Sequence, residues 1–95
     1  GFCLVGSEMC IRDRIYPALG LAAEAGEVAN KVKKILRDGT FDHKGISDEI
    51  GDCLWYIAAL CRDLNIDMSE VAKNNIRKLQ ERKRKGTIQG SGDDR

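Results

Sequence analysis

One short pattern of residues occurs twice in this chain, 25 residues apart, and it limits what the chain can fold into. Residues 21–28 read LAAEAGEV and residues 46–53 read ISDEIGDC, so that Glu24 aligns with Glu49 and Glu27 with Asp52. The apolar residues of each copy step by four and three positions, which is the spacing of one buried stripe along a helix. These apolar residues are Leu21, Ala25, Val28, Val32 and Ile35 in the first copy and Ile46, Ile50, Cys53, Ile57 and Leu60 in the second. The repeat predicts two helices, each with two carboxylates on one shoulder of its core face.

These carboxylates lower the stability of the helices that carry them. Like charges three or four residues apart on a helix repel by a few tenths of a kcal/mol. Glycine inside a helix costs roughly 1 kcal/mol relative to alanine, and Gly26 and Gly51 occupy matching positions. Only Glu27 among the four acids has a lysine, Lys31, four residues later. Ordinary charged flanks of surface helices remain an alternative, but the repeated arrangement favours a metal site where two helices meet.

The predicted fold is all-α, because no strand pattern competes with the helical one. The pattern predicts a first helix over about 18–37, a loop at 40–45, a second helix from there to about 64, and a third helix from Met68 to about 84. Pro17 is expected in the first turn of the first helix, and Asp67 is expected to cap the third. Three amphipathic helices leave apolar surface uncovered, so we expect a four-helix-bundle-type core to form on oligomerisation, in a homodimer or homotetramer.

The register of the first two helices is a separate question. In a plain hairpin Glu27 and Glu49 would be offset by roughly 10 Å, because they lie at unequal distances from the turn. Either the connecting loop climbs back along the first helix, or the two helices splay.

Three segments are expected along the chain. Residues 1–14, GFCLVGSEMCIRDR, show no clear period and are predicted to be a non-native or disordered leader. Residues 15–85 form the all-α domain, and residues 86–95 form a glycine-rich tail.

Composition excludes some partners and locations. The formal net charge of +1 gives no general argument for nucleic acid or membrane binding, and no apolar run approaches the roughly 20 residues of a membrane span. The basic third helix lacks the interleaved aromatic residues that would favour nucleic acid. Four cysteines without Cys-x-x-Cys spacing give no zinc signal, and Cys53 and Cys61 are expected to be reduced core residues. These features predict a cytoplasmic protein.

The four acids predict a metal site built from oxygen ligands. With no histidine or cysteine placed among them as a ligand, the acids suit Mg²⁺ or Mn²⁺ rather than zinc. A ferritin-like di-iron centre needs Glu-x-x-His on each of two helices, and His43, the only histidine, lies in the predicted loop. Mg²⁺ held by carboxylates usually also contacts substrate phosphates, so the site points to phosphoryl chemistry.

The two acidic motifs resemble a known signature. Glu24-x-x-Glu27 and Glu49-x-x-Asp52, within LGLAAEAGEV and DEIGDCLWYI, are similar to those of MazG-like nucleoside triphosphate pyrophosphohydrolases. Residues 75–82, NIRKLQER, resemble the Asn-x-x-Lys element of that family, and residues 86–95 resemble the tail of a bacterial and phage subgroup. The resemblance covers residues 16–95. The family usually has one more helix before the first one here, which can line the nucleotide pocket.

The resemblance implies Mg²⁺-dependent hydrolysis of a nucleoside triphosphate to the monophosphate and pyrophosphate, as in housecleaning of the nucleotide pool. It assigns the metal to Glu24, Glu27, Glu49 and Asp52, and the proton of the attacking water to Glu24 or Glu49. It makes substrate ligands of Asn75, Lys78, Arg82 and Trp55. A solvated helix face for Asn75 and Lys78, a helix-end role for the basic residues from Arg82 on, and a core or interface role for Trp55 stay open as alternatives. The alternative function is a non-catalytic helical dimerisation or regulatory module.

Overall fold

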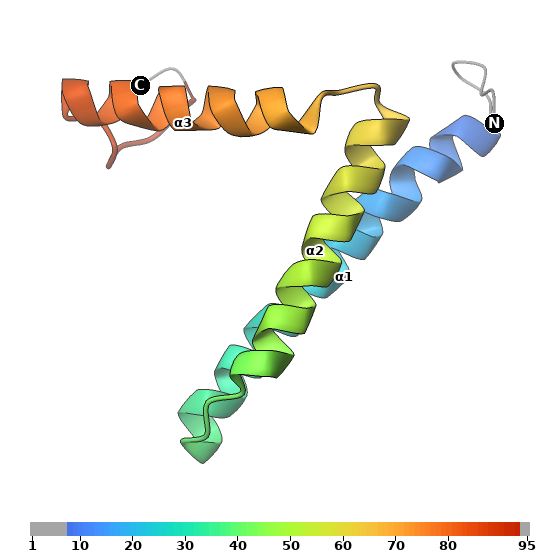
Figure 1. The fold of residues 1–95 in the computed structure, drawn as a ribbon, viewed down its shortest axis with the longest axis vertical. Helices are drawn as coiled ribbons and strands as arrows, with labels where there is room; N and C mark the ends of the chain where they lie inside the picture. Colours follow the sequence, from blue (N-terminus) through green and yellow to red (C-terminus); the bar gives the residue numbers. More distant parts are fainter. Residues whose placement is uncertain (1–7, 94–95) are drawn as a thin grey trace. The chain divides into compact units, whose positions relative to one another are not determined.

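The computed structural model of this chain describes residues 8–93, with side chains from residue 15 onward. The described residues form three helices, α1 (Glu8–Asp38), α2 (His43–Asp63) and α3 (Met68–Lys85), and contain no strand (Figure 1). The all-α prediction is confirmed. The chain divides into two units, of which the first contains α1 and α2 and the second, Ile66–Arg95, contains α3.

The start of α1 differs from the predicted one. The helix begins at Glu8 rather than near Ala18, so that Pro17 lies inside it and not in its first turn. A proline inside a helix removes one hydrogen bond and crowds the preceding turn, at a cost of about 3 kcal/mol. Pro17 is buried, and the apolar surface it removes from water offsets part of that cost. Residues 8–14 of the predicted leader are helical in backbone, and residues 1–7 lie outside the described residues, so the leader itself stays a prediction.

The loop between α1 and α2 turns back along α1. Gly39, with a φ of 72°, ends α1, and Asp42 caps α2 by accepting a 2.9 Å hydrogen bond from the Gly45 amide. Nζ of Lys31 lies 3.6 Å from Oδ2 of Asp42, so α2 begins beside Lys31 rather than beside the last turn of α1. Of the two arrangements that the sequence left open, the structure therefore has the climbing loop.

The contact between α1 and α2 is rotated relative to the predicted stripe. Ala25 and Val32 of that stripe are exposed, whereas Glu24 and Glu49 are half-buried. Several side chains of the contact are at least partly removed from solvent. They include Leu21, Glu24, Val28, Lys31 and Ile35 of α1 and Ile46, Glu49, Cys53, Tyr56 and Leu60 of α2. The prediction that all four acids flank the core is therefore wrong for Glu24 and Glu49, which lie in the contact itself.

This rotation leaves apolar side chains uncovered on one side of the α1–α2 hairpin. Leu36 is 85% exposed and Leu54 is 51% exposed. At about 100° per residue, Leu36 is rotated about the axis of α1 in one direction from Glu24, and Leu54 is rotated about the axis of α2 in the same direction from Glu49. Glu27 on α1, and Asp52 and Trp55 on α2, are rotated in the opposite direction. Because α1 and α2 are antiparallel, equal rotations on both helices lead to the same side of the hairpin. We call the first side the apolar face; it consists of Val32, Leu36, Ile50, Leu54 and Leu64.

The ends of α3 are set by local contacts. Oδ1 of Asp67 accepts a 3.2 Å hydrogen bond from the Glu70 amide, which confirms the predicted cap, and Gly86 ends the helix with a φ of 73°. Arg82 is buried, and its Nη2 donates a 2.8 Å hydrogen bond to the carbonyl oxygen of Asp93. The described part of the glycine-rich tail therefore folds back on the last turns of α3.

We expect Asp67→Ala to destabilise α3 by about 1 kcal/mol, because it leaves the Glu70 amide without its side-chain acceptor. Chemical denaturation followed by circular dichroism measures this loss. Asp67→Ser is the control, since serine also caps helices and should retain most of the stability. Equal stability of the alanine variant and the unsubstituted chain would contradict the capping role.

Two further observations concern the predicted location. Cys53 and Cys61 are free and half-buried, so the prediction that they are core residues is not confirmed. Within the part of the chain that the structure describes, no helix has the length and apolar character needed to cross a bilayer. The cytoplasmic location stays a prediction.

Candidate metal centre

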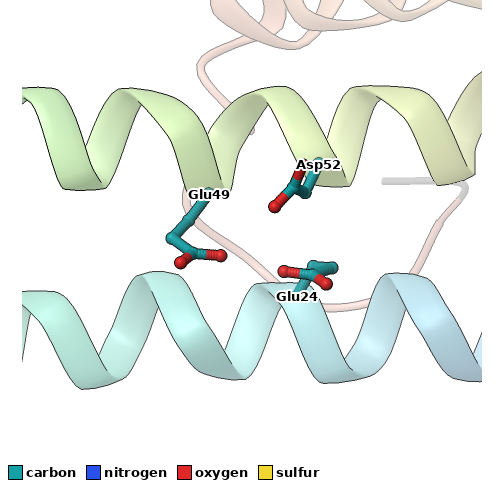
Figure 2. A group of neighbouring side chains, drawn as sticks. All are labelled: Glu24, Glu49 and Asp52. Carbon is teal, nitrogen blue, oxygen red and sulfur yellow. The ribbon is translucent and has the colours of Figure 1, made fainter.

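Three carboxylates from two helices converge between α1 and α2. Figure 2 shows Glu24 of α1 pointing towards Glu49 and Asp52 of α2. One carboxylate oxygen from each residue can be chosen so that all three lie within 4.8 Å of one another. Glu49 and Asp52 are one helical turn apart, and the register set by the climbing loop brings Glu24 opposite them.

The close approach of these acids is unfavourable without a counter-charge. A hydrogen bond between the Glu24 and Glu49 side chains is the largest cause that raises the pKa of Glu24 above its ordinary value. Partial burial and the negative charges of Asp52, Glu49 and Glu27 raise this pKa further. Two carboxyl groups this close need a proton or a cation between them.

The donor set suits a small, hard divalent cation. All three groups offer oxygen, and no histidine or cysteine joins them among the described residues. Mg²⁺ binds oxygen ligands at about 2.0–2.1 Å in an octahedron, which places neighbouring ligand oxygens roughly 3 Å apart and opposite ones roughly 4 Å apart. Small side-chain rotations bring oxygens that lie within 4.8 Å of one another to those separations. The residues present therefore fit the predicted metal.

Glu27, the fourth predicted ligand, lies outside this group. Its side chain is exposed on the rim of the site, on the same side of the hairpin as Asp52. Its charge still contributes to the raised pKa of Glu24, so it lies close enough to act on the group. The structure thus brings three of the four predicted metal ligands together.

A shallow hollow adjoins the carboxylates. It has a volume of about 400 Å³ and is lined by Glu24, Asp52, Trp55 and Tyr56. Trp55 is 62% exposed and meets the ring of Tyr56 edge-on, with 5.1 Å between the ring centroids. The interpretation of Trp55 as a core residue of this chain is therefore wrong. Tyr56 was missed as a site residue, although its position one turn after Asp52 was a signal for it.

The comparison with known families agrees with this geometry. The family model of the MazG nucleotide pyrophosphohydrolase domain matches residues 17–87. This chain belongs to the MazG family. A curated relative, Gene 37 protein of Mycobacterium phage L5, is 51% identical over 85 residues, covering 84% of this chain and 75% of its own length. No solved structure matches the chain significantly.

The other predicted substrate ligands of this MazG domain lie on α3, in the second unit. Asn75, Lys78 and Arg82 follow one another at helical spacing and share one stripe of α3. Asn75 and Lys78 are exposed, whereas Arg82 is buried and donates to the tail. Their part in substrate binding stays a prediction, and for Arg82 the structure gives a contact that holds the tail.

Proposed function

We propose that this MazG domain hydrolyses a nucleoside triphosphate to the monophosphate and pyrophosphate, with Mg²⁺ or Mn²⁺ as its cofactor. The observation that carries the proposal is the convergence of Glu24, Glu49 and Asp52 in one group of oxygen donors. Membership of a family described as nucleotide pyrophosphohydrolases supports the reaction class.

In this reaction a water oxygen attacks the α-phosphorus, and the bond from that phosphorus to the α–β bridging oxygen breaks. Pyrophosphate leaves with the bridging oxygen, and the proton of the water passes to a carboxylate. Glu24 and Glu49 are the candidates for that base, because both are half-buried in the group and close enough to share a hydrogen bond. Bound Mg²⁺ would neutralise negative charge on the phosphate oxygens and would lower the pKa of coordinated water.

The direct test is an assay of the purified chain with each common and modified nucleoside triphosphate, with Mg²⁺ or with EDTA. The expected products are the monophosphate and pyrophosphate in equal amounts, formed only with the metal. Release of orthophosphate, or turnover in EDTA, would contradict the proposal. A folded protein that binds Mn²⁺ but releases no pyrophosphate would favour the non-catalytic module.

Glu27→Gln should weaken Mn²⁺ affinity by roughly tenfold. This loss of affinity should be smaller than the loss on replacing a member of the convergent group, which consists of Glu24, Glu49 and Asp52. Glu27 lies outside that group, yet its charge acts on Glu24, and groups around a metal's ligands typically contribute 10–100-fold in affinity. Isothermal titration with Mn²⁺ measures the effect. A loss as large as that of Glu49→Gln would make Glu27 a full ligand, and no loss would remove it from the site.

A second copy of this chain is the proposed partner on the apolar face. The face runs along both helices of the hairpin, and an exposed apolar surface shared by two antiparallel helices is what a four-helix core buries. It lies on the opposite side of the hairpin from Asp52 and Trp55, so pairing there leaves the hollow beside the carboxylates accessible.

A further inference from the structure

Gly20 of α1 lies in close contact with the ring of Tyr56 of α2. A methyl group on Gly20 would overlap the ring of Tyr56, whose Cδ1 would lie only 2.6 Å from it. No other residue type leaves that space, because glycine alone lacks a Cβ. By contrast, a Cβ on Gly26 or on Gly51 would meet nothing within 4 Å. The glycine that brings the helices together is therefore not one of the repeated pair.

This contact lies one helical turn from the carboxylates on both helices. Gly20 precedes Glu24 by four residues, and Tyr56 follows Asp52 by four, so each acid shares a face with one partner of the contact. Tyr56 also lines the hollow with Glu24 and Asp52. A displacement of the Tyr56 ring therefore acts directly on the place where those acids meet.

Neighbouring rings restrict Tyr56 from two further directions. The centroid of the Tyr16 ring lies 6.5 Å away at a tilt of 54°, and that of Trp55 lies 5.1 Å away at 89°. Partial burial, with smaller contributions from Tyr16 and from the charges of Glu24 and Asp52, raises the pKa of the Tyr56 hydroxyl. Tyr56 is therefore a neutral, half-buried wedge between the helices.

We propose that Tyr56, seated on Gly20, is a positioning residue of the carboxylate site, whose ring sets the helix separation at which Glu24 reaches Glu49 and Asp52. The expected effect of Tyr56 on catalysis rests on the proposed function, whereas its expected effect on metal binding does not depend on turnover. The ring, rather than the hydroxyl, carries this role, because the close contact with Gly20 is made by ring carbons.

Gly20→Ala compared with Gly26→Ala tests the inference with one substitution at two positions of the same helix. In Gly20→Ala the ring of Tyr56 must move into the hollow or the helices must separate. We expect Mn²⁺ affinity to fall by at least about tenfold, as when groups that orient metal ligands are removed, and kcat to fall more than KM rises. Gly26→Ala has open space for its methyl group and should bind Mn²⁺ as the unsubstituted chain does. Equal affinities of the two folded variants would overturn the proposal.

Tyr56→Leu and Tyr56→Phe complete the test, and they decide it if Gly20→Ala does not fold. Leucine removes the wedge and should lower Mn²⁺ affinity in a protein whose circular dichroism is unchanged. Phenylalanine keeps the ring and should restore affinity and kcat to within about threefold of tyrosine. A loss with phenylalanine as large as with leucine would overturn the role of the ring. If the Mn²⁺ affinities change as expected but neither the unsubstituted chain nor any variant releases pyrophosphate, the proposed function fails and the positioning role stands.

Discussion

Glu49→Gln should abolish pyrophosphate release while leaving the helices intact. Glu49 shares a hydrogen bond with Glu24 and belongs to the convergent group, so its replacement removes an anionic oxygen from the metal site. It also removes one of the two candidate bases. A positioned general base alone contributes about 10²–10⁴-fold to rate. We expect kcat/KM to fall by at least that factor, with Mn²⁺ affinity falling in parallel.

The stability of the metal-free protein should hold or rise slightly in this variant, because one of several clustered negative charges is removed. Circular dichroism and thermal unfolding in EDTA measure this. Asp48→Asn is the matched control, since Asp48 is the adjacent acid on the same helix but lies outside the group, where its Oδ2 pairs with Nζ of Lys44 at 2.9 Å. The control should keep near-normal turnover. Activity of Glu49→Gln above about a tenth of the unsubstituted level would exclude Glu49 from the site.

Leu54→Glu should convert the proposed dimer or larger assembly of this chain to a monomer. Leu54 is half exposed on the apolar face, and in a symmetric dimer the substitution occurs twice. Burying one leucine side chain contributes about 1.5–3 kcal/mol, and a buried unpaired carboxylate adds a further cost. The dissociation constant should therefore rise by about a thousandfold or more, at 1.4 kcal/mol for each factor of ten.

Sedimentation velocity at micromolar concentration measures the change in assembly. Arg62→Glu is the control: it introduces the same side chain at an exposed position of α2 outside the apolar face. The control should sediment as the unsubstituted chain does. A well-folded monomer before any substitution, or equal effects of the two glutamates, would contradict pairing through the apolar face.

The sequence by itself determined the features that depend on residues close together in the chain. A cap acts within one helical turn, so Asp67 and Glu70 were enough to place the start of α3. The acids were identified in the same way, because Glu49 and Asp52 are one turn apart on any helix that contains them. The repeat then predicted the partner helix, and Glu24 does meet this pair.

Only the tertiary structure decided which stripe of each helix faces the other. Alanines and a valine flank the first acidic motif, and isoleucines, a cysteine and a leucine flank the second, so the apolar residues form a band wide enough for more than one rotation of the helix pair. The rotation observed places Glu24 and Glu49 in the contact and leaves Val32 and Leu54 exposed. Packing shape selects this arrangement: the ring of Tyr56 fits against α1 where Gly20 offers no side chain, and these two residues are 36 positions apart in the chain. No local preference encodes such a fit, because it exists only once two distant segments have come together.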